Sequence, residues 1–222
     1  LQKGVVRVDG TVDPYTFSGG VVDSFEISAA HGAIPTLKAS FVFKDMTTAT
    51  SYATPSYVSS PSLFHFAQGA ITIGGSVTEP TTTAIASGGT SVATVTDFSV
   101  KVDNKLNADR YAYGGAGKMS QPTYGLRDVG GKLTIEYDSQ TMTSAYVADT
   151  ELALTLTFTS AESLSTGYAT LQIVLPAIKL NGELPKTNGT DLITQSVDFD
   201  VLDNLSAAQP IWCVLRTADT AL

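Results

Sequence analysis

The sequence predicts an all-β fold with one or two short helices, arranged as a β-sandwich or barrel. Apolar and polar residues alternate along most of the 222 residues, which places them on opposite faces of strands. Charged residues make up only 15% of the chain, and abundant threonine and serine suit pleated, half-buried surfaces. Residues 22–27 and 95–100 show the same strand pattern, and each follows small residues.

Strands are expected wherever the alternation persists. Phe98, Val100 and Val102, for example, alternate with charged or hydroxyl side chains. One strand is expected to stop at Pro176, because proline cannot donate to a sheet ladder. The last strand is apolar on both faces and is therefore expected to be central or covered by a partner. The expected strands are residues 5–8, 21–27, 37–43, 64–73, 95–104, 132–138, 152–159, 171–175, 197–201 and 211–215.

Helix signals are few. Asp138 or Ser139 can cap a short helix that runs through Ala148. Met142 and Tyr146, four residues apart on this helix, are expected to face the sheet. Residues 159–162 fit a capping box, which predicts one or two helical turns ending at Gly167.

Three segments are expected to be irregular: residues 10–20, 45–62 and 77–91. Long loops without structure are uncommon in compact domains unless they function or are disordered. Tyrosine is frequent at interfaces, so we expect residues 45–62 to contact a neighbouring subunit, the alternative being a solvated surface loop. Residues 182–190 are expected to form a simple turn. The residues expected at the subunit contact are Tyr52, Pro55, Tyr57 and Pro61.

The composition argues against several classes of function. The net charge is −8 and no run of lysine or arginine occurs, so a surface that grips nucleic acid is not expected. The apolar runs are too short to span a membrane. His31 and His65 have no carboxylate or cysteine at metal-ligand spacing, so neither a metal nor another cofactor is expected. Cys213 lies in an apolar run and is expected to be a buried structural thiol.

Two pairs of carboxylates are the strongest catalytic candidates. Glu136 with Asp138, and Asp198 with Asp200, lie two residues apart on the outward faces of expected strands. Glycosidases use two carboxylates, but nothing apolar nearby would raise one pKa to make an acid. The glycine-rich residues 114–118 lack the hydroxyl that follows lysine in a phosphate loop. We therefore expect solvated faces and no enzyme.

Residues 91–159 resemble the tail tube proteins of long-tailed, siphovirus-like bacteriophages. The resemblance lies in the strand at residues 95–104, the glycine-rich turn at 114–117, the strand at 131–137, a short helix and the strand at 152–158. Residues 21–27, 174–180 and 196–201 also look like that family.

The resemblance implies one tail tube domain over residues 1–222, in which six subunits close into a ring-shaped β-barrel. Stacked rings would form a hollow tube in the virion that conducts DNA as a non-specific cargo, without a membrane. Its implied partners are the tape measure, tail terminator and distal tail proteins, with assembly in the host cytoplasm. The segments that would bridge neighbouring rings are an N-terminal arm at residues 1–20, the loop at 45–62 and a C-terminal strand or arm at 205–222.

A tube of this kind would have room for duplex DNA. Four strands from each of six subunits, about 4.8 Å apart and tilted by about 40°, give a circle roughly 48 Å across. An acidic lining would repel phosphate and let DNA slide. The residues expected to face the lumen are Glu136, Asp138, Asp198 and Asp200. The alternatives are another virion structural component or a carbohydrate-binding β-sandwich, although Trp212 is the sole tryptophan.

Overall fold

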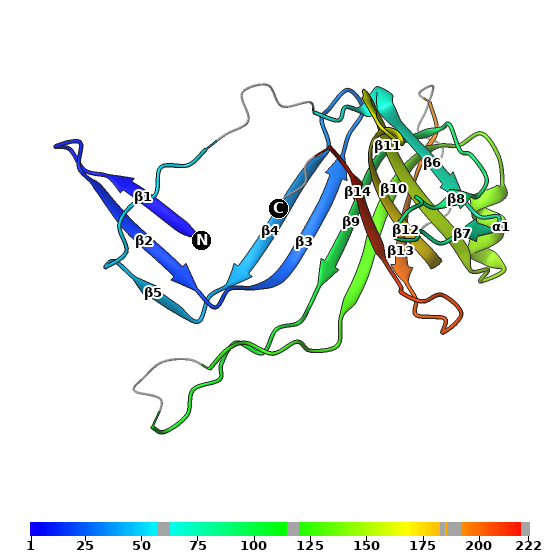
Figure 1. Ribbon diagram of the computed structural model, residues 1–222. Coiled ribbons are helices and arrows are strands. Elements are labelled where there is room, and N and C mark those ends of the chain that lie inside the picture. The colour runs from blue at the N-terminus through cyan, green and yellow to red at the C-terminus, as the bar shows by residue number, and fades with distance from the viewer. Residues whose placement is uncertain (57–62, 115–119, 183–184, 186–191, 219–222) are drawn as a thin grey trace. The chain divides into compact units, whose positions relative to one another are not determined.

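The computed structural model describes residues 1–56, 63–114, 120–182, 185 and 192–218, and the fold of this part is all-β as predicted (Figure 1). It contains one short α-helix, α1 (Thr141–Val147), and one 3-10 turn, η1 (Phe66–Gln68). The strands are β1 (Gln2–Val6), β2 (Val12–Ser18), β3 (Val21–Ala29), β4 (Thr36–Val42), β5 (Asp45–Thr47), β6 (Gly69–Ile73), β7 (Val77–Thr78), β8 (Ser87–Gly88), β9 (Val95–Asp103), β10 (Asp128–Glu136), β11 (Leu152–Leu164), β12 (Gly167–Gly182), β13 (Thr194–Val201) and β14 (Trp212–Arg216).

The largest sheet has nine strands, eight of which follow the order β4-β3-β9-β10-β13-β12-β11-β6. The 16-residue strand β12 pairs with three other strands of this sheet. Strand β11 pairs along one edge of β12, while β14 and β13 pair in succession along the other, at residues 170–174 and 178–182. The two smaller sheets are β1-β2-β5 and β7-β8.

The core lies on the apolar face that the alternation predicts. Leu133 of β10 pairs in register with Val197 of β13, and both side chains are buried. The rings of Phe98 on β9 and Phe158 on β11 lie 5.8 Å apart between centroids. Three strands separate β9 from β11 in the sheet, so the sheet curls until its apolar face meets itself. Helix α1 packs beside β12.

A glycine permits close packing at the centre of this core. Gly131 of β10 pairs in register with Phe199 of β13. A Cβ on Gly131 would lie 2.2 Å from the carbonyl oxygen of Ser99 and 2.5 Å from the Cζ atom of Phe199. The ring of Phe199 therefore occupies the space above the glycine, where the lack of a side chain lets it approach the backbone closely.

The chain divides into two compact units. The first contains the β1-β2-β5 sheet, where the rings of Phe17 and Phe43 lie 5.2 Å apart. The second contains β11, β12, β13, β14 and helix α1. That the whole chain acts as one domain stays a prediction. The first unit is Leu1–Glu26, Lys38–Pro61 and Val102–Asp128, and the second is Ile27–Leu37, Ser62–Lys101 and Val129–Leu222.

The helix predicted from residue 159 is wrong, because β11 continues through that segment to Leu164. Ser160 does not cap a helix; its Oγ accepts the N–H of Glu162 at 2.9 Å. A shift in register between Thr159 and Ser163 absorbs the polar residues as a bulge, and the strand then turns back into β12 at Gly167.

The predicted stop at Pro176 is also wrong. Strand β12 passes through this proline because no ladder bond is required of its nitrogen there. Opposite β11 the register shifts between the pairs that involve Leu175 and Ile178, so Pro176 falls at a bulge. On the other edge, Pro176 lies between the residues that pair with β14 and those that pair with β13.

Two segments are more regular than expected. Residues 12–18 are not an irregular arm but form β2, which pairs with β1 and β5. Residues 77–91 contain the β7-β8 pair, and the buried side chain of Gln172 bonds both the N–H and the carbonyl of Ala86, at 2.8 Å and 3.1 Å. The strand expected from residue 64 begins only at Gly69, after the turn η1.

Helix α1 confirms the predicted short helix, but two side chains lie differently from the prediction. Tyr146 is exposed and does not face the sheet. Cys213 is exposed as well, because β14 pairs with β12 alone and its odd-numbered residues, Cys213 and Leu215, lie on the solvent side. The predicted turn at residues 182–190 lies mostly outside the described residues.

Candidate assembly surfaces

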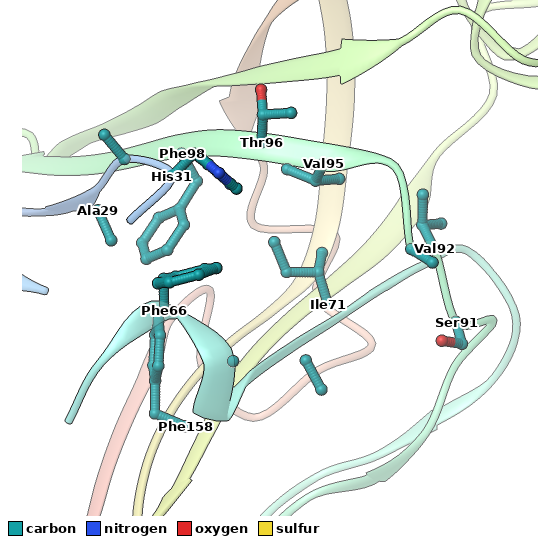
Figure 2. Close-up of a pocket in the computed structure, with 14 residues that line it drawn as sticks. Ala29, His31, Phe66, Ile71, Ser91, Val92, Val95, Thr96, Phe98 and Phe158 are labelled. Atoms are coloured by element: carbon teal, nitrogen blue, oxygen red, sulfur yellow. The ribbon is translucent and has the colours of Figure 1, made fainter. Parts of the chain in front are cut away.

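One cavity of the second unit is lined mostly by apolar side chains. It measures about 320 Å³ and is walled by Phe66, Phe98 and Phe158 (Figure 2). The ring of His31 lies 5.0 Å from that of Phe66. Among the described residues that line this cavity, His31 is the only ionisable one, so the cavity lacks a pair of groups for acid–base chemistry.

A second hollow, of about 250 Å³, brings Glu136 and Asp138 to one place. Both carboxylates line it together with Tyr137, Met142 and Gln195. Within the described residues, no group of three or more histidine, cysteine, aspartate or glutamate side chains could hold a metal ion. Nor does any helix there have the length and apolarity needed to cross a membrane.

Three of the four carboxylates predicted to face a lumen share one face of the sheet. Asp198 and Asp200 of β13 alternate with buried residues and pair in register with Lys132 and Gly130 of β10. Glu136 of β10 lies on the same side, since cross-strand partners and residues two apart share a face. Asp138 lies beyond the end of β10 and is exposed.

This polar face is mixed in charge and not uniformly acidic. The Nζ atom of Lys132 lies 3.8 Å from Oδ1 of Asp198. The amide of Asn181 donates to Asp200. Lys179 lies opposite Asp200 in the register of β12 and β13, but its Nζ atom binds Oδ2 of Asp149 at 2.6 Å. Because these pairs are exposed, they contribute little to stability, but they reduce the negative potential along the face.

Strand β4 ends the largest sheet and is exposed on both faces. In the sheet order it has a neighbour only in β3, so within the described chain its other edge presents unpaired backbone groups. Leu37 and Phe41 lie on one face and are 67% and 48% exposed. An amphipathic strand with an uncovered apolar face and an open edge favours pairing with another chain.

The predicted contact loop is partly tied to its own chain. Residues 45–47 form β5, and Gln2 binds the backbone of Ser51 and Ala53 at 3.1 Å and 2.8 Å. The ring of Tyr52 lies against Gly4, and a Cβ there would approach it to 2.6 Å. Pro55 is exposed. Tyr57 and Pro61 lie outside the described residues.

A second extended segment, described at residues 105–114 and 120–127, joins β9 to β10 and was not predicted from the sequence. Figure 1 shows its two limbs running side by side, and they are bridged between Asn107 and Thr123. Tyr111, Tyr124 and Leu126 are 66%, 64% and 91% exposed, and Tyr113 is fully exposed. The spacing of tyrosines on either side of the glycine-rich residues 114–117 was the sequence signal that could have identified it.

Nearly the whole chain matches a known protein family. The sequence model of the family described as phage tail tube protein matches residues 2–201, which run from the start of β1 to the end of β13. No curated protein matches the chain.

Proposed function

Because the chain belongs to the phage tail tube protein family and is thus a structural protein of the virion tail, we propose that six copies close into a ring and that such rings stack into a hollow tube conducting viral DNA. The observation that carries the proposal is the exposure of β4 on both faces and along one edge. The proposal requires neither catalysis nor a cofactor. Assembly would take place in the host cytoplasm.

Pairing of β4 with a second copy would satisfy the backbone groups along its open edge and place side chains of the copy beside Leu37 and Phe41. A head-to-tail contact of this kind generates a ring when the rotation between copies closes. Burial of Leu37 and Phe41 would add hydrophobic stabilisation, at about 25 cal/mol for each Å² of apolar surface removed from water, to the backbone bonds formed along the edge.

The face that bears Glu136, Asp198 and Asp200 is the candidate lining of the tube, with Asp138 at the end of its strand. Carboxylates repel the phosphates of a passing duplex, so DNA would not adhere. Lys132, which lies 3.8 Å from Asp198, moderates that repulsion. A cryo-electron microscopy map of the tube that placed all four carboxylates on the exterior would end this part of the proposal.

The ring-to-ring contacts are proposed to involve residues 45–62 and the two ends of the chain, residues 1–20 and 205–222. Pro55 is exposed, and Tyr52 remains 40% exposed above Gly4, so both are open to a neighbouring copy. The tape measure protein would occupy the bore during assembly, and the terminator and distal tail proteins would close the two ends of the stack.

The test is electron microscopy and sedimentation of the purified chain. The wild type is expected to form rings and hollow tubes, whereas L37E/F41E places charge on the uncovered face of β4 and should remain monomeric with an unchanged circular dichroism spectrum. V147E makes the same kind of change on the exposed end of α1 and serves as the matched control. Monomeric wild type, or tubes from L37E/F41E as abundant as those of the control, would contradict the proposal.

A further inference from the structure

The described residues 105–114 and 120–127 form the two limbs of an arm, which is held at its root by one buried side chain, Asn104. The Nδ2 atom of Asn104 donates to the carbonyl of Val22 at 3.0 Å, and its Oδ1 accepts from Nε of Arg127 at 3.0 Å. Its backbone N–H donates to Asp23 at 2.8 Å, and its carbonyl accepts from Gly125 at 3.1 Å. Both limbs of the arm are therefore fastened where they leave β9 and β10.

The limbs are also joined to each other further out. The N–H of Asn107 donates to the carbonyl of Thr123 at 2.9 Å. Nη1 of Arg110 donates to the carbonyl of Gln121 at 2.8 Å, and the carbonyl of Arg110 accepts from Ser120 at 2.8 Å. Because these bonds order the backbone beforehand, a partner that binds the arm has less conformational entropy to remove.

The charge of the arm is opposite to that of the rest of the chain. Four basic residues and one acidic residue give the arm a net charge of +3, so the remaining residues carry −11 of the total of −8. Lys105 is engaged at the root, 3.1 Å from Asp103 and 3.5 Å from Asp128. Arg110, Lys118 and Arg127 still outnumber the single Asp109.

We infer that this arm docks onto the acidic surface of a second copy of the chain, a contact that rests on the proposed stacking and names a further element for it. Three tyrosine rings bury at least about 150 Å² each on full contact, and Leu126 adds to this. The sum is more than half of the roughly 800 Å² that each partner contributes to a stable interface. Six such arms in one ring would act together, so each contact can be modest.

Site-specific photo-crosslinking tests the contact directly. Tyr113 is replaced by p-benzoylphenylalanine, and ¹⁵N-labelled and unlabelled copies are mixed before assembly. Crosslinked peptides that join a labelled to an unlabelled chain are expected, with the partner peptide rich in aspartate or glutamate. Tubes that form without any crosslink from Tyr113 would overturn the inference.

Substitution of the three exposed tyrosines provides the second measurement. Y111S/Y113S/Y124S removes the aromatic surface. Y111F/Y113F/Y124F keeps the three aromatic side chains and is the matched control. The serine variant should lower the fraction of protein that sediments as tubes at least tenfold and should still form single six-subunit rings. The phenylalanine variant should assemble as the wild type does. Unchanged assembly of the serine variant, or a loss confined to duplex DNA binding in a fluorescence anisotropy assay, would refute docking onto a second copy.

Failure of the proposed tube and failure of the arm contact give different results. Wild type that forms neither rings nor tubes, yet yields crosslinks between copies from Tyr113, would refute the tube and retain the arm contact. Tubes of wild type together with unaffected tubes of the serine variant would retain the tube and refute the arm contact.

Discussion

Substitution of Gly131 by alanine should destabilise the second unit, because there is no space for the added methyl group. The new Cβ would lie 2.2 Å from the carbonyl oxygen of Ser99 and 2.5 Å from Cζ of Phe199. The first of these atoms belongs to the backbone of β9, and the second to a ring that is 1% exposed. Neither can move without displacing its neighbours in the core.

The expected loss can be bounded from two opposing effects. Overpacking of a core by one methyl group costs about 1–3 kcal/mol. Replacing glycine by alanine restricts the unfolded chain and returns about 0.4–1 kcal/mol. The net loss should be about 1–2 kcal/mol, which for a chain of this size lowers Tm by roughly 3–6 °C.

Urea unfolding followed by the fluorescence of Trp212 is a suitable assay, because this tryptophan belongs to the same unit as Gly131. Gly130→Ala is the matched control: its Cβ would lie 3.0 Å from the carbonyl oxygen of Phe199 and 3.5 Å from Oδ1 of Asp200. The control should lose less stability than Gly131→Ala, because its shortest contact is 3.0 Å, whereas Gly131→Ala makes contacts of 2.2 Å and 2.5 Å. Equal midpoints for the two variants, or greater stability of Gly131→Ala, would refute the close packing described for this strand.

Three other predictions concern individual side chains. Asn104→Ala should lower the free energy of unfolding by about 1–3 kcal/mol, since it leaves Arg127 without its acceptor at the root of the arm, and should speed amide hydrogen exchange in residues 105–127. The hydrogen bond from Arg7 lowers the pKa of Asp13. The Asp13 carboxylate therefore stabilises the β1-β2 pair at pH values above its pKa in the unfolded chain, and this contribution is lost as the pH falls through the lower pKa of the folded chain. NMR titration of Arg7→Gln should show the pKa of Asp13 rising. Although Cys213 as a residue is exposed, burial of its sulfur raises the pKa of the thiol, so labelling with a thiol reagent should be slow at pH 7 and accelerate only above the ordinary pKa of cysteine.

The strands that were predicted correctly are those whose two faces differ. In β10 and β13 most of the buried residues are apolar and lie two apart, so Leu133 and Phe199 could be assigned to the core and Asp198 to the polar face from the sequence. Period-two alternation is the signal that tertiary structure preserves, because a slip of one residue would expose the whole apolar set. The family resemblance added the function, which the alternation alone could not supply.

The errors occur where non-local pairing overrides a local signal. Thr159 to Glu162 has the residues of a helix cap, and Pro176 has no N–H, yet both lie within strands that are bound on neighbouring edges. A bulge accommodates each of them, and its position depends on partners distant in sequence. The two limbs at residues 105–114 and 120–127 were missed for a related reason: bonds from Asn104 and between the limbs hold them, and no periodicity in the sequence marks those bonds.

A filament of stacked rings needs two different contacts between copies, and the two surfaces described above should respond differently to salt. The proposed pairing at β4 would rest on backbone hydrogen bonds and apolar burial, which salt does not weaken. The proposed docking of the basic arm on a second copy would include attraction between exposed charges. Raising the salt concentration from about 0.05 M to about 0.5 M shortens the screening length from roughly 14 Å to roughly 4 Å. Tubes should therefore dissociate into rings before rings dissociate into monomers, as followed by light scattering and electron microscopy. Direct conversion of tubes into monomers, or tubes more persistent than isolated rings at high salt, would contradict the division of roles between β4 and the arm.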